Sequence, residues 1–205
     1  MISVIISSVL QIGIVLLICG FFYLFSPREG FLGYVGLRPA PVAIVAIGGV
    51  VGLCSAGLLI AVPGVRALAG GPGSVLAAQT THGVNTQVIV ALVVLAVFKT
   101  ALAEEILFRG LIAKRLTTWW GFAVGNIAQA LLFGSVHLLF ALVTKPDLGA
   151  LAAISTFAAV MGWLSGWMKE RFASGSILPG VAAHACANLV TYLTLPLVYG
   201  MHQSP

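Results

Sequence analysis

The stretch Ala103-Glu104-Glu105-Ile106-Leu107-Phe108-Arg109-Gly110 places three charged side chains inside a largely apolar segment that runs from Gln87 to Ala113. A charge costs about 3 kcal/mol at the centre of a membrane helix on insertion scales, so such groups face a protein interior or a wet cavity rather than lipid. The stretch therefore predicts a membrane-embedded helix that carries a functional site.

The composition of the whole chain agrees with a membrane location. The 205 residues are 60% hydrophobic and 7% charged, and the mean hydropathy is +1.11. A soluble globular domain has about 25% charged residues, so this class is excluded. The formal net charge of +5 includes no basic run longer than two residues, which argues against nucleic acid as a partner.

Apolar segments of the length that a bilayer crossing requires, about 20 residues, recur along the chain. We predict six helices, at about 2–25, 42–62, 87–113, 125–143, 149–168 and 174–199. The first has no basic n-region and is expected to be retained rather than cleaved. Residues 66–86 are predicted to form an exposed loop with a short surface helix. The prediction is an all-α polytopic helix bundle, one domain over 1–205 with its core motifs in 100–192 and an intramembrane polar cavity.

Charged loop residues indicate the orientation, because cytoplasmic loops of membrane proteins are enriched in Lys and Arg. The loops after helices one, three and five contain Arg28, Arg38, Lys114, Arg115, Lys169 and Arg171. The loops after helices two and four contain Arg66 and Lys145. We therefore predict a multi-pass protein of the cytoplasmic membrane with both termini outside and the active site open toward the cytoplasm.

Two of the three charges in the opening stretch are spaced to form an ion pair. Glu105 and Arg109 are four residues apart and share one helix face. Glu104 is rotated from Glu105 by about 100° and has only Thr100 near it on its own helix. Glu104 is therefore the candidate general base, while Glu105 and Arg109 are candidates for a structural pair; the alternative is that both glutamates only lock helices together.

The fourth helix carries a histidine, His137, which lies on the same predicted face as Asn126, with Gln129 beside that face. A polar stripe that leads to a histidine predicts a water-filled track from the cytoplasmic end. The alternative is that His137 only hydrogen-bonds to a neighbouring helix.

The sixth helix carries His184 and Asn188 on one face, followed one turn later by Thr191. Two hydrogen-bond donors from one helix can stabilise the negative charge that develops on an attacked carbonyl oxygen. The alternative is interhelical hydrogen bonding, which is the role we expect for Thr191.

These motifs together resemble the signature of the CAAX-protease and bacteriocin-processing family (CPBP, also called Abi) of intramembrane glutamate endopeptidases. That signature has two glutamates and an arginine, then a phenylalanine four residues before a histidine, then a histidine four residues before an asparagine. The matching residues are Glu104, Glu105, Arg109, Phe133, His137, His184 and Asn188.

The resemblance implies an endopeptidase that needs no metal and no cofactor. Glu104 and His137 would activate a water molecule, and His184 and Asn188 would stabilise the oxyanion. Glu105, Arg109 and Phe133 would support the site. The implied substrate is a prenylated or otherwise hydrophobic peptide, cleaved near its C terminus in the lipid bilayer.

Other functions remain compatible with these residues. A zinc hydrolase could use His137, His184 and a glutamate as ligands, although the His-Glu-x-x-His pattern is absent from the sequence. An acyl or lipid transferase could use the same base and oxyanion donors. A non-enzymatic immunity-type protein would use the polar cluster only structurally.

The depth of His137 sets a geometric condition. A straight fourth helix from Thr118 would place His137 too deep to meet Glu104 and His184. We therefore predict that residues 119–124 run along the membrane interface and that the fourth helix begins near Gly125.

Overall fold

The computed structural model of the chain describes residues 1–25, 30–70, 85–139 and 147–200, and every regular element in these ranges is a helix. The elements are α1 (Ile2–Leu24), α2 (Phe31–Tyr34), α3 (Val42–Ala61), α4 (Pro63–Gly70), α6 (Thr86–Val94), η1 (Leu95–Leu102), α7 (Ala103–Glu105), η2 (Ile106–Ile112), α8 (Ala113–Val136), η3 (His137–Leu139), α10 (Leu148–Arg171) and α11 (Leu178–Gly200). The predicted all-α class is confirmed.

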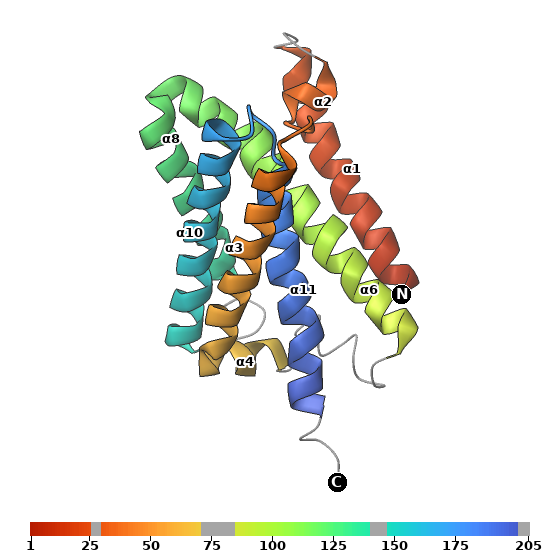
Figure 1. The fold of residues 1–205 in the computed structure, drawn as a ribbon. Coiled ribbons are helices and arrows are strands. Elements are labelled where there is room, and N and C mark those ends of the chain that lie inside the picture. The colour runs from red at the N-terminus through yellow and green to blue at the C-terminus, as the bar shows by residue number, and fades with distance from the viewer. Residues whose placement is uncertain (26–29, 71–84, 140–146, 201–205) are drawn as a thin grey trace.

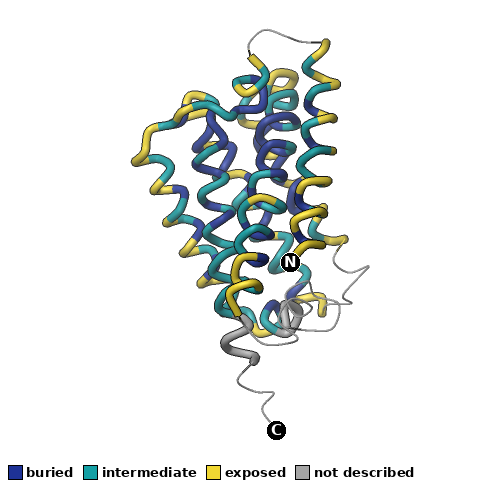
Figure 2. The backbone as a smooth tube through the Cα atoms, turned by 90° about the vertical axis from the view of Figure 1, so that its right-hand side faces the viewer, coloured by how far each residue is buried: buried dark blue, intermediate teal, exposed yellow. Residues whose placement is uncertain are grey.

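Four helical stretches of the described chain are long and apolar enough to cross a membrane: Ile2–Leu24, Val42–Ala61, Thr86–Leu139 and Leu148–Arg171. The third has 54 residues and folds back on itself, so it supplies two arms of the bundle (Figure 1). The helix α11 runs through the middle, against α3, η1 and α10. The outer helices expose large apolar side chains, such as Leu17 at 75%, and buried positions lie along the interior (Figure 2). An apolar exterior of this kind suits lipid.

The reversal of the long stretch occurs at Gly121, whose φ of 75° and ψ of 165° interrupt α8. Glycine has no Cβ and adopts this backbone conformation without the steric cost that other residues incur. The predicted end of the third helix at Lys114 and Arg115 is wrong, because helical backbone continues to Trp120. The fourth helix begins directly after Gly121 rather than near Gly125, and the straight helix from Thr118 is excluded.

The other observed helix boundaries agree with the predicted ones within a few residues, and some predictions concern residues that the structure does not describe. The short helix α4 starts at Pro63, where the second helix was predicted to end. The predicted end of the fourth helix near Val143, most of the predicted loop at 66–86, and the cations Arg28 and Lys145 lie outside the described residues.

The segment around the two glutamates is not a regular α-helix. Two π-helical stretches, η1 and η2, flank α7. Within η1 the Thr100 hydroxyl lies 3.0 Å from the Leu95 carbonyl oxygen and 2.9 Å from that of Ala96, to which it donates. Such back-bonding bends membrane helices, and π-helical turns occur frequently at functional sites.

A polar link joins α1 to the same long helix. The Lys99 ammonium donates to the Ser7 hydroxyl at 3.1 Å, and the Gln11 amide donates to the Lys99 carbonyl at 2.8 Å. The sequence interpretation gave Lys99 no role. A lysine within a membrane helix needs a polar partner, so the position of Lys99 in the sequence could have predicted a contact of this kind.

The central helix α11 is held against α3 by small residues. A Cβ atom on Gly48 would collide with the backbone of Pro179, and one on Gly52 would collide with the backbone of Ala183. Small residues at this spacing let two membrane helices approach to backbone contact. Because Ala183 precedes His184, this contact also sets where the imidazole lies.

We predict that Gly52→Leu separates α3 from α11 and lowers the free energy of unfolding by about 1–3 kcal/mol, the usual cost of overpacking. Thermal unfolding of the purified protein in detergent measures the effect. The matched control is Gly57→Leu on the same helix, where a Cβ atom meets nothing within 4 Å. Equal stability of the two variants would contradict the packing argument.

Candidate active site

Two helices bring an imidazole to the paired glutamates. The Nε2 atom of His184, on α11, lies 3.9 Å from Oε2 of Glu104, on α7. Its Nδ1 atom lies 3.5 Å from Oε1 of Glu105. The single ring of His184 is thus in ion-pair range of both carboxylates.

The two glutamates have different surroundings. Glu105 forms the predicted ion pair with Arg109, with Oε1 and Nη1 3.0 Å apart and both side chains 1% exposed. The Glu104 side chain is 27% exposed. Because Glu105 is buried and paired with Arg109, Glu104 is the more accessible of the two carboxylates.

The ring of Phe133 contacts three other groups of the site. Its ring centroid lies 5.0 Å from that of His137 and 5.9 Å from that of His184, both edge-on. The guanidinium of Arg109 lies 4.1 Å from the same centroid, in cation–π geometry. The ring therefore fixes the spacing of the two imidazoles and covers the buried cation.

His137 lies at the end of the second arm of the long helix, in η3. Its Nδ1 atom is 2.9 Å from the Phe133 carbonyl oxygen. A carbonyl oxygen only accepts, so Nδ1 carries the proton and Nε2 carries the lone pair in the neutral ring. His137 is also within electrostatic range of Glu104 and His184.

Asn188 is oriented by a residue of the long helix. Its Nδ2 atom donates to the Thr100 hydroxyl oxygen at 2.6 Å. That hydroxyl has already donated its own hydrogen to the carbonyls of its helix, so it can only accept from Asn188. The Thr191 hydroxyl donates to the Ala187 carbonyl of its own helix at 2.8 Å, which is not the interhelical bond predicted for it.

The predicted water track through Asn126 and Gln129 is wrong. Both side chains are buried, and they bond to each other at 2.9 Å. Asn126 donates to the Trp163 carbonyl at 3.0 Å, and Gln129 donates to the Gly162 carbonyl at 2.8 Å. These amides therefore join α8 to α10, because backbone carbonyls are the partners that polar side chains find inside a membrane bundle.

Two residues near the cluster escaped the sequence interpretation. Thr100 was noted only as a neighbour of Glu104, but it is the partner of Asn188. Tyr192 lies against Thr100 and within electrostatic range of Glu104. The sequence could have indicated Tyr192, because it follows Asn188 by four residues and therefore lies on the same helix face.

Within the ranges that the structure describes, no group of three or more His, Cys, Asp or Glu side chains is arranged to hold a metal ion.

The fold and the cluster of acid, imidazoles and amide define a membrane-embedded protein with a polar site between its helices. The family model described as type II CAAX prenyl endopeptidase Rce1-like matches residues 85–190, which include all of the sequence motifs and just over half of the chain. The chain belongs to this family of CAAX-type membrane proteases. A search of curated proteins and a search of solved structures each found no match.

We predict that Arg109→Met lowers the free energy of unfolding by about 3–5 kcal/mol, because it leaves Glu105 buried without its counter-charge. The double variant Glu105→Gln, Arg109→Met removes both charges and is expected to recover much of that loss. Unfolding in mixed micelles, followed by circular dichroism, measures both. A double variant no more stable than Arg109→Met would contradict this account.

Proposed function

We propose that this protein is an intramembrane endopeptidase that hydrolyses a peptide bond near the C terminus of a prenylated or otherwise hydrophobic peptide. The observation that carries the proposal is the contrast between the two glutamates. Glu105 is sealed against Arg109, while Glu104 is partly exposed and lies within 3.9 Å of His184. A reachable carboxylate beside an imidazole is suited to activating water.

In this proposal the attacking water is held by Glu104 and by Nε2 of His137. Both are hydrogen-bond acceptors, so both hydrogens of the water point toward the protein and a lone pair of its oxygen points toward the peptide carbonyl. Glu104 takes the proton as the oxygen–carbon bond forms, and it returns the proton to the leaving amine as the carbon–nitrogen bond breaks. The reaction needs no metal and no cofactor.

The oxyanion that forms on the attacked carbonyl is stabilised by His184 and Asn188. Asn188 has two amide hydrogens and gives one to Thr100, so the second can be directed at the substrate. Donors that are oriented before the reaction stabilise developing charge without reorganisation. Phe133, Glu105 and Arg109 hold these groups in position.

We further propose that the site opens toward the cytoplasm. The start of α1 and the end of α11 lie at the end of the bundle opposite to α2 (Figure 1). The cations Arg38, Lys114 and Lys169 lie around one cavity with residues of α2. The positive-inside tendency then places the α2 end in the cytoplasm and the termini outside, in the cytoplasmic membrane.

We predict that Glu104→Gln lowers peptide hydrolysis at least 100-fold, because an amide cannot accept the proton. The assay uses proteoliposomes and a peptide with a prenylated cysteine followed by three residues, with products identified by mass spectrometry. The matched control is Asp147→Asn, which removes a carboxylate that caps α10 and keeps a capping oxygen. Full activity of a folded Glu104→Gln variant would end the proposal.

Two additions to the same assay separate the alternatives. In water enriched in oxygen-18, hydrolysis puts the label into the new carboxylate, whereas acyl transfer puts an acceptor molecule there instead. Activity that persists with a chelator is expected; activity lost with the chelator and restored by zinc would overturn metal independence. Absence of any product from the unmutated protein with prenylated and unprenylated hydrophobic peptides would favour a non-enzymatic role.

We also predict that Thr100→Val lowers kcat about 10-fold or more with little change in KM, because Asn188 loses the acceptor that orients its amide. Thr100→Ser keeps the hydroxyl and is expected to restore most of kcat. Adding Asn188→Ala to Thr100→Val should then cost less than it does in the unmutated protein. Additive losses would show that the two residues act independently.

A further inference from the structure

Lys99 is a cation inside the first arm of the long membrane-spanning stretch, five residues before Glu104. Its side chain is half-buried. The ammonium donates to the Ser7 hydroxyl of α1 at 3.1 Å, and this hydroxyl in turn donates to the Val4 carbonyl at 3.0 Å. An ammonium has three hydrogens, so the bond to α1 leaves two of them for a further acceptor.

Ser7 gives Lys99 a hydrogen-bond acceptor but no counter-charge. The sequence has five acidic residues, and the structure describes four of them. These four have other partners: Glu104 with His184, Glu105 with Arg109, Asp147 with the Ala150 N–H, and Glu170 with Lys169. A cation at membrane depth is costly without negative charge nearby, and such residues commonly serve a substrate or an ion. An anionic group from outside the chain would therefore stabilise Lys99.

Lys99 also lies next to the candidate active site along the helix. The following residue, Thr100, accepts a hydrogen bond from Asn188 at 2.6 Å. Five helical residues rise by about 7 Å, which is the axial spacing between Lys99 and Glu104. The arm runs from the end of the bundle near the N terminus toward the α2 end, so Glu104 is the nearer of the two to the α2 end (Figure 1).

The spacing fits the end of a short peptide. In the peptide of the assay above, three residues follow the bond to be cleaved, and an extended chain spans about 3.3 Å per residue. Its terminal carboxylate then lies at most about 10 Å beyond that bond. A peptide that enters from the α2 end with its C terminus first can place this bond at Glu104. The long and flexible side chain of Lys99 can then meet the carboxylate.

We propose that Lys99 binds the terminal carboxylate of the peptide substrate and thereby selects which bond lies at Glu104. This inference rests on the proposed endopeptidase function. Hydrogen bonds between an ammonium and a carboxylate are roughly twice as strong as neutral ones, so the terminal carboxylate is a better partner than a backbone carbonyl. Lys99 is in this way a specificity-determining residue outside the catalytic cluster, and its bond to Ser7 keeps the ammonium in place.

Two prenylated peptides that differ only in a terminal carboxylate or carboxamide test the proposal. With the unmutated protein we expect kcat/KM to be about tenfold lower for the amide, mainly through KM. Lys99→Gln should lower kcat/KM for the acid by a similar factor and leave the amide nearly unchanged, whereas Lys99→Arg should keep the preference. The matched control is Arg171→Gln, which removes an exposed cation at the end of α10 and should keep the full preference.

Equal hydrolysis of the two peptides by the unmutated protein would overturn the role of Lys99 and leave the endopeptidase function standing. Equal losses for both peptides in Lys99→Gln would do the same, because they would show that Lys99 only holds α1. Hydrolysis of neither peptide would instead overturn the proposed function. Binding of the two peptides to Glu104→Gln in nanodiscs requires no hydrolysis; the acid should bind about tenfold more tightly, and equal affinities would again count against Lys99.

Discussion

The structure depends on how one pair of opposite charges is kept inside hydrocarbon. Glu105 and Arg109 neutralise each other at 3.0 Å with almost no exposure, and the ring of Phe133 covers the guanidinium at 4.1 Å. If either partner were missing, the bundle would contain an isolated charge at a depth where water is scarce. The pair also leaves the adjacent Glu104 on a different face of the helix, where the exposed carboxylate meets His184.

The same constraint explains why polar residues in this bundle do not all belong to the site. Asn126 and Gln129 satisfy their amides on backbone carbonyls of α10, and Lys99 donates to Ser7 of α1. Each of these side chains hydrogen-bonds to a neighbouring helix, so its polar group is used in holding the bundle together. The groups of the candidate site differ, because Glu104 remains partly exposed.

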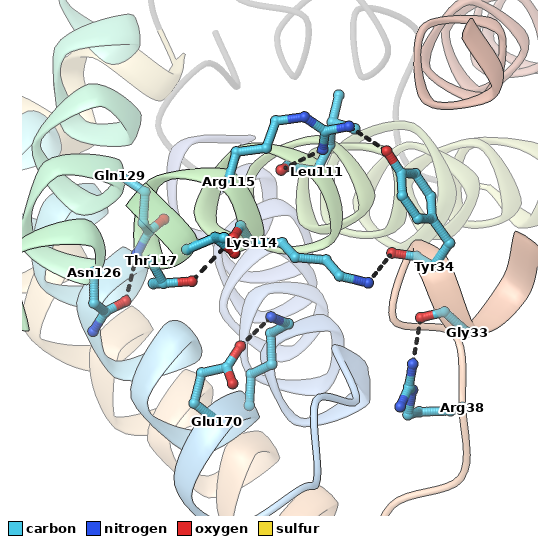
Figure 3. A network of polar contacts seen from close by, with 12 residues as sticks. Gly33, Tyr34, Arg38, Leu111, Lys114, Arg115, Thr117, Asn126, Gln129 and Glu170 are labelled. Atoms are coloured by element: carbon cyan, nitrogen blue, oxygen red, sulfur yellow. Dashed lines mark hydrogen bonds and ion pairs between the residues drawn. The ribbon is translucent and has the colours of Figure 1, made fainter. Parts of the chain in front are cut away.

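One continuous helical stretch contributes to two separate regions of the bundle. Its middle carries Glu104 and Glu105 between π-helical turns, and its later turns carry Lys114 beside the cavity at the α2 end (Figure 3). The reversal at Gly121 then returns the chain so that His137 reaches the cluster from a second arm. The candidate active site inside the bundle and the cavity at its α2 end therefore lie along one helix path.

The sequence by itself determined the helical class, most helix positions and the Glu105–Arg109 pair, because hydrophobic length and the four-residue spacing are local properties. Only the tertiary structure decided the partners of Asn126, Lys99 and Asn188. Those contacts depend on how helices distant in sequence are rotated and how closely they approach, as at Gly52. Hydrophobic periodicity predicts neither the rotation nor the distance. The π-helical turn at Thr100 likewise arises where a side chain bonds to the backbone, which regular periodicity does not predict.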